Sequence, residues 1–417
     1  MIYLDHAAAT PVDARVLKAM EPYFTEDFFN PSAAYLPAKK VAADYETAKA
    51  TIAHAIGAKA SDLVITAGAT EANNLAFTSL LTREQVGDFS GTGVAPARRH
   101  GRSAPSSSVV TSGHPLKAPT CSRVLYLVTE HDSVRRVAER FGGQAIKVLP
   151  SGLIDLNDLR GKITDETELI SVALVNNELG AIQPLAEIAK IIREVKIDRM
   201  KRGIKTQLLL HSDASQALNL LDINVARLGV DLLTLNAAKI YGPKGVGALY
   251  VSHEVKLSPL TVGGGQERGL RSGTENVPGV IGFARAVELA HEHLNGNRKK
   301  YAKWRNILLD GLEGYELINK KHCLDNFIVV CFDGIDAERL VFLLEEKGVY
   351  VATGAACAAS KGVRSHVLSA IGLSDSQIAG SLRLTLGETN SEEQMHEVVN
   401  VINEIVSSEC TRVKALR

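Results

Sequence analysis

Hydrophobic residues in the first two thirds of the chain gather in short runs, and polar residues dominate the amphipathic stretches between them. Five of these runs are typical of buried β-strands: Leu63–Thr66, Val124–Val128, Leu169–Val175, Gln207–His211 and Leu232–Leu235. The intervening stretches have helical periodicity. This alternation predicts an α/β fold whose mainly parallel sheet is covered by helices on both faces.

The pattern changes after the segment "TVGGGQERGLRSGTENVPG", which starts at residue 261. A long helix is expected near residues 277–296, and shorter strands and helices follow in an α+β order, from the strand "CLDNFIVVCF" to the closing helix "SEEQMHEVVNVINEIVSS". We therefore expect two domains. The large α/β domain would span residues 16–261, and a smaller α+β domain would combine residues 1–15 with 262–417.

Residues 84–120 interrupt the alternation of strands and helices. They are dense in Gly, Pro, Ser and Arg and have no apolar periodicity. We interpret them as a flexible surface insertion. A basic docking loop is the functional alternative for this segment.

Composition and charge exclude several classes of protein. The 417 residues include 47 basic and 47 acidic side chains, so no basic field favours nucleic acid or a membrane surface. No apolar run approaches the roughly 18 residues of a membrane helix. The N-terminal "MIYLDHAAATPVD" lacks the basic and apolar regions of a signal peptide. We expect a cytoplasmic protein without a membrane partner.

Small and hydroxylic residues follow the first predicted strand. Leu63–Thr66 leads to Gly68, Ala69 and Thr70, which open a helix. Free backbone N–H groups at a helix start, together with a hydroxyl, form a site suited to phosphate. The structural alternative is an ordinary helix cap, with Thr70 as the capping residue and Glu71 in the first turn.

Polar side chains also follow the other four predicted strands. They are His131, Asn177, Asp213 with Gln216 three residues later, and Lys239. Each residue alone also has a structural explanation: a helix cap for the asparagine, a solvated charge for the aspartate and the lysine, and a histidine whose hydrogen bonds are made within the fold. Because ligands of an open α/β sheet bind outside the carboxyl ends of its strands, we expect all of these side chains at one edge.

Together these side chains match the needs of pyridoxal phosphate. This cofactor requires a lysine for its Schiff base, an acid that keeps the pyridine nitrogen protonated, and a phosphate cup. Lys239 can serve as the lysine and Asp213 as the acid. His131 can stack on the ring and move protons, and Gln216 can donate to the phenolic oxygen.

Nine segments carry a resemblance to a known family: "YLDHAAATPVD", "AGATEANNLAF", "TEHDSV", "VNNELGAIQPL", "SDASQA", "KIYGPKGVGALYV", "RSGTENVPG", "TGAACAAS" and "SLRLTLG". They resemble the NifS/IscS-type cysteine desulfurases of the class V aminotransferase family. The resemblance runs nearly end to end, apart from residues 84–120. It implies a pyridoxal-phosphate enzyme of fold type I.

The resemblance implies roles for the residues that match the family's motifs. The cofactor would be held covalently by Lys239, paired at its pyridinium with Asp213, stacked under His131 and bound at its phenolic oxygen by Gln216. The remaining implied cofactor contacts are Ala69, Thr70, Asn177, Asn236 and Thr274.

Two of these implied roles concern the dimer and the substrate. Thr274, in "RSGT", would reach the phosphate of a second subunit, so the family implies a two-fold homodimer with shared active sites. Arg383 would bind the α-carboxylate of the substrate L-cysteine, close to Asn177, and a bidentate guanidinium suits that task.

The five cysteines are scattered, without a C-x-x-C pair that would predict a zinc site or a disulfide framework. The resemblance implies that Cys357 is the nucleophile. It would take sulfur from L-cysteine, which leaves L-alanine and an enzyme persulfide. A protein acceptor, which is an iron–sulfur scaffold, a tRNA-thiolation relay or another carrier, would then receive the sulfur. On composition alone, Cys357 is a small buried residue in an Ala-rich turn.

The chain departs from the family just before the lysine. Many relatives carry Ser-x-His there, whereas this chain has Asn236, Ala237 and Ala238. A lost hydrogen bond to a charged group costs about 1.5–3 kcal/mol, so we expect weaker cofactor binding. The departure leaves alternatives open: a degenerate, non-catalytic scaffold for sulfur delivery, or a selenocysteine lyase or aminotransferase of the same family.

Overall fold

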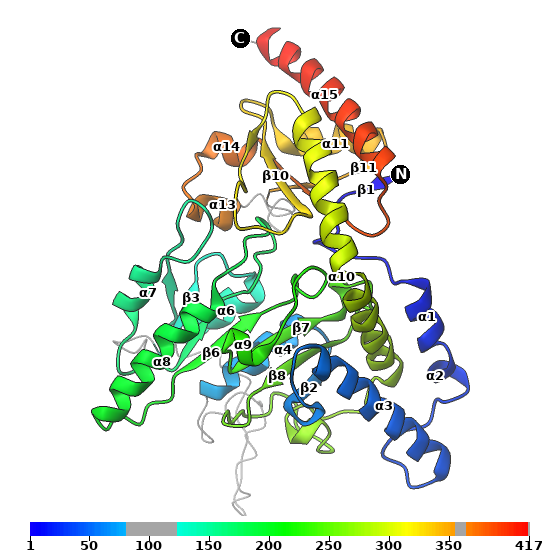
Figure 1. Cartoon of the computed structure of the whole chain (residues 1–417), viewed down its shortest axis with the longest axis vertical. Helices are drawn as coiled ribbons and strands as arrows, with labels where there is room; N and C mark the ends of the chain where they lie inside the picture. The colour runs from blue at the N-terminus through cyan, green and yellow to red at the C-terminus, as the bar shows by residue number, and fades with distance from the viewer. Residues whose placement is uncertain (81–122, 355–363, 416–417) are drawn as a thin grey trace, which may run out of the picture.

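A computed structural model describes residues 1–80, 123–354 and 364–415 of the chain (Figure 1). The predicted insertion 84–120 and the predicted nucleophile Cys357 lie outside the described residues. Helices in the described part are α1 (Ala14–Met20), α2 (Pro22–Thr25), α3 (Leu36–Ala55), α4 (Ala69–Phe77), α6 (Asp132–Arg140), α7 (Leu156–Lys162), α8 (Leu185–Lys201), α9 (Val225–Leu228), α10 (Val277–Gly311), α11 (Ala337–Glu346), α13 (His366–Ala370), α14 (Asp375–Ala379) and α15 (Glu392–Ala415).

A seven-stranded sheet forms the centre of the larger part of the molecule (Figure 1). Its strands lie in the order β2 (Leu63–Thr66), β8 (Gly247–Val251), β7 (Leu232–Asn236), β6 (Leu209–Asp213), β5 (Leu169–Ser171), β3 (Val124–Leu127) and β4 (Gln144–Ile146). Strand β8 runs antiparallel to both neighbours, and every other pairing in the sheet is parallel. The predicted α/β class with a mainly parallel sheet is confirmed.

All five predicted strands are present, with small shifts at their ends. The largest shift is in β5, which ends at Ser171 instead of Val175. The amides of Val172 and Leu174 still donate to the carbonyls of β6, at His211 and Asp213. The segment therefore stays beside β6 after the regular ladder has ended.

Helices cover both faces of this sheet, and alternate residues of each strand face different cores. In β2, Leu63 and Ile65 belong to the larger core, which includes apolar residues of α3, α8 and α10. Val64 between them belongs to a smaller core with Phe77 of α4 and Val134 of α6. A strand that is buried on both faces has a continuous run of apolar residues in its sequence. The five strands could be predicted because they have such runs.

The C-terminal part contains a four-stranded antiparallel sheet in the order β12 (Ala352–Thr353), β13 (Ser381–Thr385), β10 (Phe327–Cys331) and β9 (Glu316–Leu317). The first strand of the chain, β1 (Ile2–Tyr3), pairs in parallel with β11 (Val349–Tyr350), which lies in the same part of the molecule. The N-terminus therefore lies beside the C-terminal elements (Figure 1). This pairing agrees with the expected assignment of residues 1–15 to the smaller domain, although the domain boundaries stay predictions.

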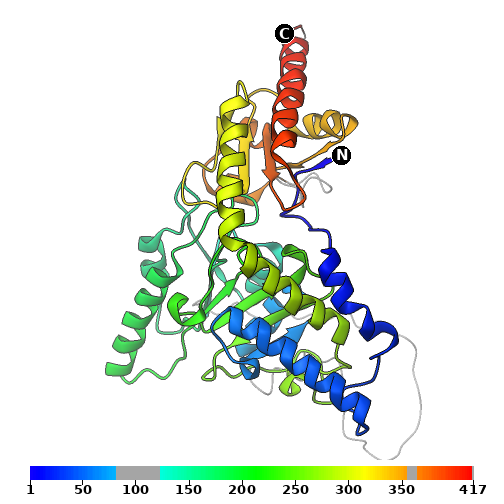
Figure 2. The same cartoon turned by 45° about the vertical axis from the view of Figure 1, so that its right-hand side comes forward.

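Helix α10 joins the two parts of the molecule. It packs on α3 beside the seven-stranded sheet and on α15 in the C-terminal part (Figure 2). The predicted helix near residues 277–296 continues to Gly311, because Tyr301, Trp304 and Leu308 extend its buried face. Within residues 1–80, 123–354 and 364–415, no helix is both long and apolar enough to cross a membrane.

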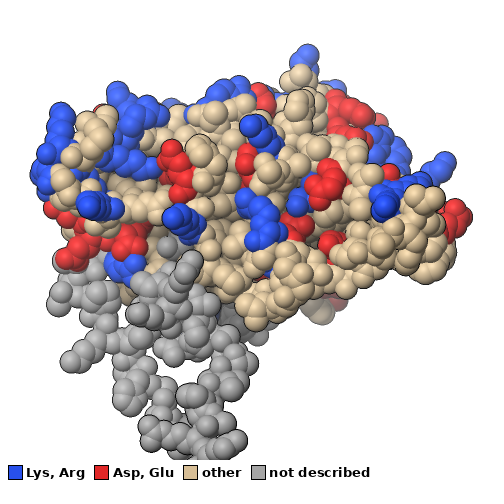
Figure 3. Space-filling view, turned by 90° about the horizontal axis from the view of Figure 1, so that it is seen from below, with Lys and Arg blue, Asp and Glu red and all other residues tan. Residues whose placement is uncertain are grey.

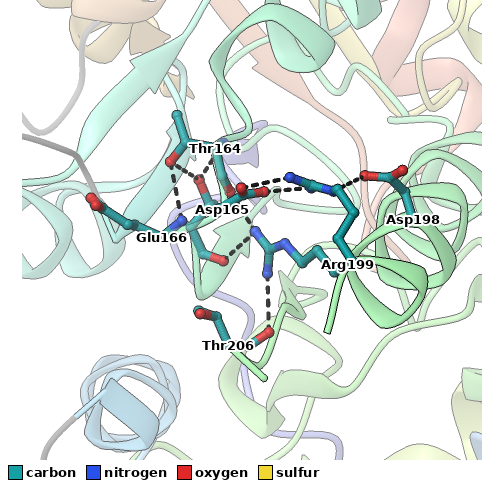
Figure 4. Close-up of polar contacts among 8 residues, drawn as sticks. Thr164, Asp165, Glu166, Asp198, Arg199 and Thr206 are labelled. Atoms are coloured by element: carbon teal, nitrogen blue, oxygen red, sulfur yellow. Dashed lines mark hydrogen bonds and ion pairs between the residues drawn. The ribbon is translucent and has the colours of Figure 1, made fainter. Parts of the chain in front are cut away.

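A buried arginine connects two chain segments that lead into the seven-stranded sheet. The buried Arg199, near the end of α8, donates to the carbonyls of Thr164, Thr167 and Thr206, and so ties together the segments that precede β5 and β6 (Figure 4). Basic and acidic side chains are interspersed on the face seen from below (Figure 3).

Candidate active site

A cavity of about 810 Å³ opens at the carboxyl ends of the parallel strands. Its volume lies within the usual range for small-molecule and cofactor sites. Nine of the predicted site residues line it: Ala69, Thr70, His131, Asn177, Asp213, Gln216, Asn236, Lys239 and Arg383. Asp213 and Lys239 therefore face one common space, as the predicted cofactor requires.

Lys239 reaches the cavity from the turn that follows β7. The Asn236 side chain accepts a hydrogen bond from the Ala238 amide over 3.2 Å, and this shapes the turn. The Lys239 Nζ donates to the carbonyl of Ala7 over 2.8 Å and to that of Ala8 over 2.5 Å. The N-terminal segment of the chain thus provides acceptors for this amine.

Asp213 is the last residue of β6, and only 8% of its surface is exposed. Its Oδ1 accepts from the Ser215 amide over 2.9 Å, and its Oδ2 accepts from Asn73 Nδ2 over 2.8 Å. Both carboxylate oxygens therefore have donors, which hold the Asp213 side chain in the wall of the cavity.

His131 caps the start of α6. Its Nδ1 accepts from the Ser133 amide over 3.1 Å, so a neutral ring carries its proton on Nε2. The Ser133 hydroxyl also contacts Nδ1 over 2.9 Å and accepts from Asn73 Nδ2 over 2.8 Å. A chain of hydrogen bonds therefore links His131 to Asp213 through Ser133 and Asn73.

The start of α4 supplies backbone donors to the cavity. Gly68 precedes this helix with φ 140°, a conformation that L side chains rarely adopt. A Cβ added to Gly247 would lie 2.8 Å from the Cα of Gly68, so these two chain segments approach closely. The first turn leaves the amides of Ala69 and Thr70 without helical acceptors, and such amides bind anions.

Arg383 enters the cavity from β13, the strand paired with β10 and β12. Its Nη1 donates to the Asn177 carbonyl over 2.9 Å, and its Nη2 donates to the Asp5 carboxylate over 2.6 Å. Its Nε is buried without a hydrogen-bond partner in the described part of the chain. Both terminal nitrogens of the guanidinium therefore already have acceptors within the chain.

Two glutamates with raised pKa values lie next to these residues. Glu130 accepts from the Ala173 amide over 2.6 Å, and burial, followed by the nearby charge of Asp213, raises its pKa to about 8. Glu178 accepts from the Ser365 hydroxyl over 2.5 Å, and burial raises its pKa to about 7. Both carboxyls therefore hold protons more tightly than a solvated glutamate.

The two remaining predicted site residues stand apart from this cavity. Thr274 is exposed and is not among the residues that line the cavity of its own chain. This position is compatible with its expected contact to a second subunit, which stays a prediction. Cys357 lies outside the described residues, so its predicted role also stays a prediction.

The residues present fit pyridoxal phosphate. The cavity combines an amine on Lys239, a buried carboxylate on Asp213 and the start of α4, which are the lysine, acid and phosphate cup that this cofactor needs. Ala238, which also lines the cavity, offers no side-chain donor. The expected weakening of cofactor affinity at this position stays a prediction.

Sequence reasoning missed three residues that support the site. Asn73 lies one turn after Thr70 on α4 and joins Asp213 to Ser133. Asp5 holds Arg383, and Glu130 holds the cavity-lining Ala173. The helical spacing of Asn73 from Thr70 was a usable signal, because residues three apart share a helix face. Asp5 and Glu130 gave no comparable local signal.

Comparisons with known proteins agree with this geometry. The family model "Aminotransferase class-V" matches residues 2–89 and 104–398. The cysteine desulfurase IscS of Methanosarcina thermophila is 37% identical over an alignment that covers 97% of this chain and 92% of the relative. The cysteine desulfurase IscS 1 of Archaeoglobus fulgidus is 34% identical, and the alignment covers 97% of each chain.

Solved structures show the same relationship. A NifS-like protein superposes with a TM-score of 0.81 at 29% identity, covering 97% of this chain and 99% of the other. A structure described as SspA in complex with cysteine superposes with a TM-score of 0.73 at 30% identity, covering 93% of this chain and 99% of the other.

Proposed function

Because the chain belongs to the aminotransferase class-V family, we propose that it is a pyridoxal-phosphate-dependent cysteine desulfurase. It converts L-cysteine to L-alanine and passes the sulfur to an acceptor. One observation carries the proposal: Lys239, Asp213 and Arg383 line a single cavity in a chain whose relatives are named cysteine desulfurases.

When bound, pyridoxal phosphate supplies an aldehyde that condenses with amines and a ring that withdraws electrons from the substrate. Lys239 would hold the cofactor covalently and would move protons at its Nζ. Asp213, fixed by Asn73, would pair with the pyridine nitrogen through its carboxylate. His131 lines the same cavity and carries a proton on Nε2.

The start of α4 and the turn before Lys239 would hold the phosphate group. Ala69 and Thr70 offer backbone amides and a hydroxyl, and Asn236 offers a side-chain amide. Gln216 binds the phenolic oxygen. Thr274 of the partner subunit completes this set in a two-fold homodimer, which fits its exposed position away from its own cavity.

Arg383 binds the α-carboxylate of L-cysteine, with Asn177 beside it. The Cys357 thiolate attacks the substrate sulfur, and the substrate carbon–sulfur bond breaks. The electron pair of that bond goes to the substrate β-carbon, which takes a proton and becomes the methyl group of L-alanine. The sulfur stays on Cys357 as a persulfide until a protein acceptor, an iron–sulfur scaffold or a thiolation relay, receives it.

The proposal is tested with purified chain, pyridoxal phosphate, L-cysteine and dithiothreitol, with alanine and sulfide assayed together. We expect equal amounts of both products. Cys357→Ala should retain the cofactor and lose sulfide formation, whereas Cys410→Ser, on α15, should match the wild type. Sulfide release by Cys357→Ala at the wild-type rate overturns the role of Cys357, and a wild-type chain that releases neither product overturns the enzyme itself.

A further inference from the structure

The arginine that would bind the substrate already has a carboxylate partner within the chain. Arg383 Nη2 and Asp5 Oδ1 are 2.6 Å apart, a distance typical of strong charge-assisted hydrogen bonds. The two side chains are separated by 378 positions in the sequence. The pair therefore exists only in the folded chain.

The pair is largely removed from solvent. The Arg383 side chain is 4% exposed and that of Asp5 is 20% exposed. A buried guanidinium without a partner is costly, since its lost hydration is not replaced. Asp5 therefore keeps Arg383 compensated when no ligand is bound.

Glu178 is a second carboxyl that interacts electrostatically with Arg383. It accepts a hydrogen bond from Ser365 Oγ over 2.5 Å and, because burial raises its pKa to about 7, it is partly protonated at neutral pH. Asp5 makes the direct ion pair. It is therefore the carboxylate that an incoming anion has to replace at the guanidinium.

The main chain of Asp5 is fixed independently of its side chain. Its carbonyl accepts from the Ala8 amide over 3.0 Å and from the Tyr3 hydroxyl over 2.9 Å. Two residues later, the backbone amide of Ala7 donates to Thr385 Oγ1 over 3.0 Å. The carboxylate can consequently turn away from Arg383 by side-chain rotation while the backbone stays in place.

We propose that Asp5 is an internal counter-ion that the α-carboxylate of the amino acid displaces from Arg383. It lowers the affinity of the site for every ligand that carries this carboxylate. The inference rests on the proposed function, because it takes Arg383 as the carboxylate site. L-alanine keeps the carboxylate of L-cysteine, so the same competition speeds the release of the product.

The test measures the equilibrium binding of L-alanine to the cofactor-loaded chain. Asp5→Asn keeps an acceptor for Arg383 but removes the charge. We expect this variant to bind L-alanine about tenfold more tightly than the wild type, a difference of about 1.4 kcal/mol. L-alaninamide, which lacks the carboxylate, should bind both proteins within about twofold.

Asp222→Asn is a matched control. Asp222 forms an ion pair of the same length, 2.6 Å, with Arg227, but both side chains are more than half exposed, at 56% and 62%. It should leave both affinities unchanged. Asp5→Ser removes the same charge with a smaller side chain. It is used in place of Asp5→Asn if that variant is insoluble.

Equal or weaker binding of L-alanine by the charge-free variants overturns the inference, because a purely structural role for Asp5 does not produce tighter binding. If the wild type still converts L-cysteine in that case, the proposed function stands. If the wild type neither converts L-cysteine nor binds L-alanine, the proposed function fails first, and the inference fails with it.

Discussion

The Asn73 side chain donates to the Asp213 carboxylate over 2.8 Å and so joins helix α4 to the end of strand β6. The same amide group donates to Ser133, which contacts His131. The negative charge of the cavity wall and the histidine at its edge are thus held by one side chain. Each also accepts from a backbone amide two residues further along, at Ser215 and Ser133, so local turns and the fold position them together.

This arrangement predicts the effect of Asp213→Asn. The amide has the shape of the carboxylate but no charge, so it does not stabilise a protonated pyridine nitrogen. We expect kcat for sulfide release to fall on the order of a hundredfold, or about 2.7 kcal/mol. Cofactor content, measured by absorbance after denaturation, should stay near one per chain. A kcat within threefold of the wild type contradicts the assigned role.

Lys239→Ala should abolish covalent retention of the cofactor. After borohydride reduction, the wild type should keep the cofactor through denaturing chromatography, and the variant should lose it. Lys244→Ala is the control, because Lys244 lies five residues away and its Nζ donates to the Thr10 carbonyl, over 3.5 Å, outside the cavity lining. Retention by the Lys239→Ala chain shows that another amine holds the cofactor.

The buried ion pair between Lys49 and Glu267 predicts a stability effect. Glu267 accepts from Lys49 over 3.0 Å, and the side chains are only 8% and 6% exposed. It also accepts from the Tyr45 hydroxyl and the Ile65 amide. Glu267→Gln leaves a buried ammonium uncompensated, so we expect a loss of about 3 kcal/mol in the free energy of unfolding.

This loss should lower the apparent Tm by roughly 3 °C in a thermal denaturation scan, given the size of the chain. Asp222→Asn, which breaks an exposed pair, serves as the comparison and should shift the Tm by less than about 1 °C. Equal shifts for the two variants indicate that the buried pair contributes no more than the exposed one.

Glu130 predicts a dependence of stability on pH. Burial and the charge of Asp213 raise its pKa from 4.5 to about 8 in the folded chain. Between these values the folded state binds more protons than the unfolded state, so the contribution of Glu130 to stability falls as the pH rises. The loss begins near pH 4.5 and is complete above about pH 8.

Glu130→Gln, a neutral mimic of the protonated acid, removes this loss. In denaturant titrations between pH 5 and 9, stability of the variant relative to the wild type should rise up to about pH 8 and then level off. A constant difference across this range shows that Glu130 is ionised in the folded chain throughout.

The sequence predicted the parts of the site that a strand delivers. Lys239, Asp213 and His131 each follow an apolar run, and the parallel sheet places the ends of such runs at one edge. The supporting contacts were not predicted, because their partners are distant in sequence. Asn73 and Asp213 are 140 positions apart, and Asp5 and Arg383 are 378 apart. Local periodicity carries no information about such pairs.

Helix α10 spans 35 residues and connects the part of the molecule that carries Lys239 to the part that carries Arg383. Gly296 lies near its middle, in open space where an added Cβ would meet nothing within 4 Å. In the interior of a helix, glycine is about 1 kcal/mol less favourable than alanine. The Arg383 guanidinium is also tied to the larger part directly, because its Nη1 donates to the Asn177 carbonyl over 2.9 Å. The space available to an amino acid between the amine and the guanidinium is therefore set by this contact together with the packing of the helix.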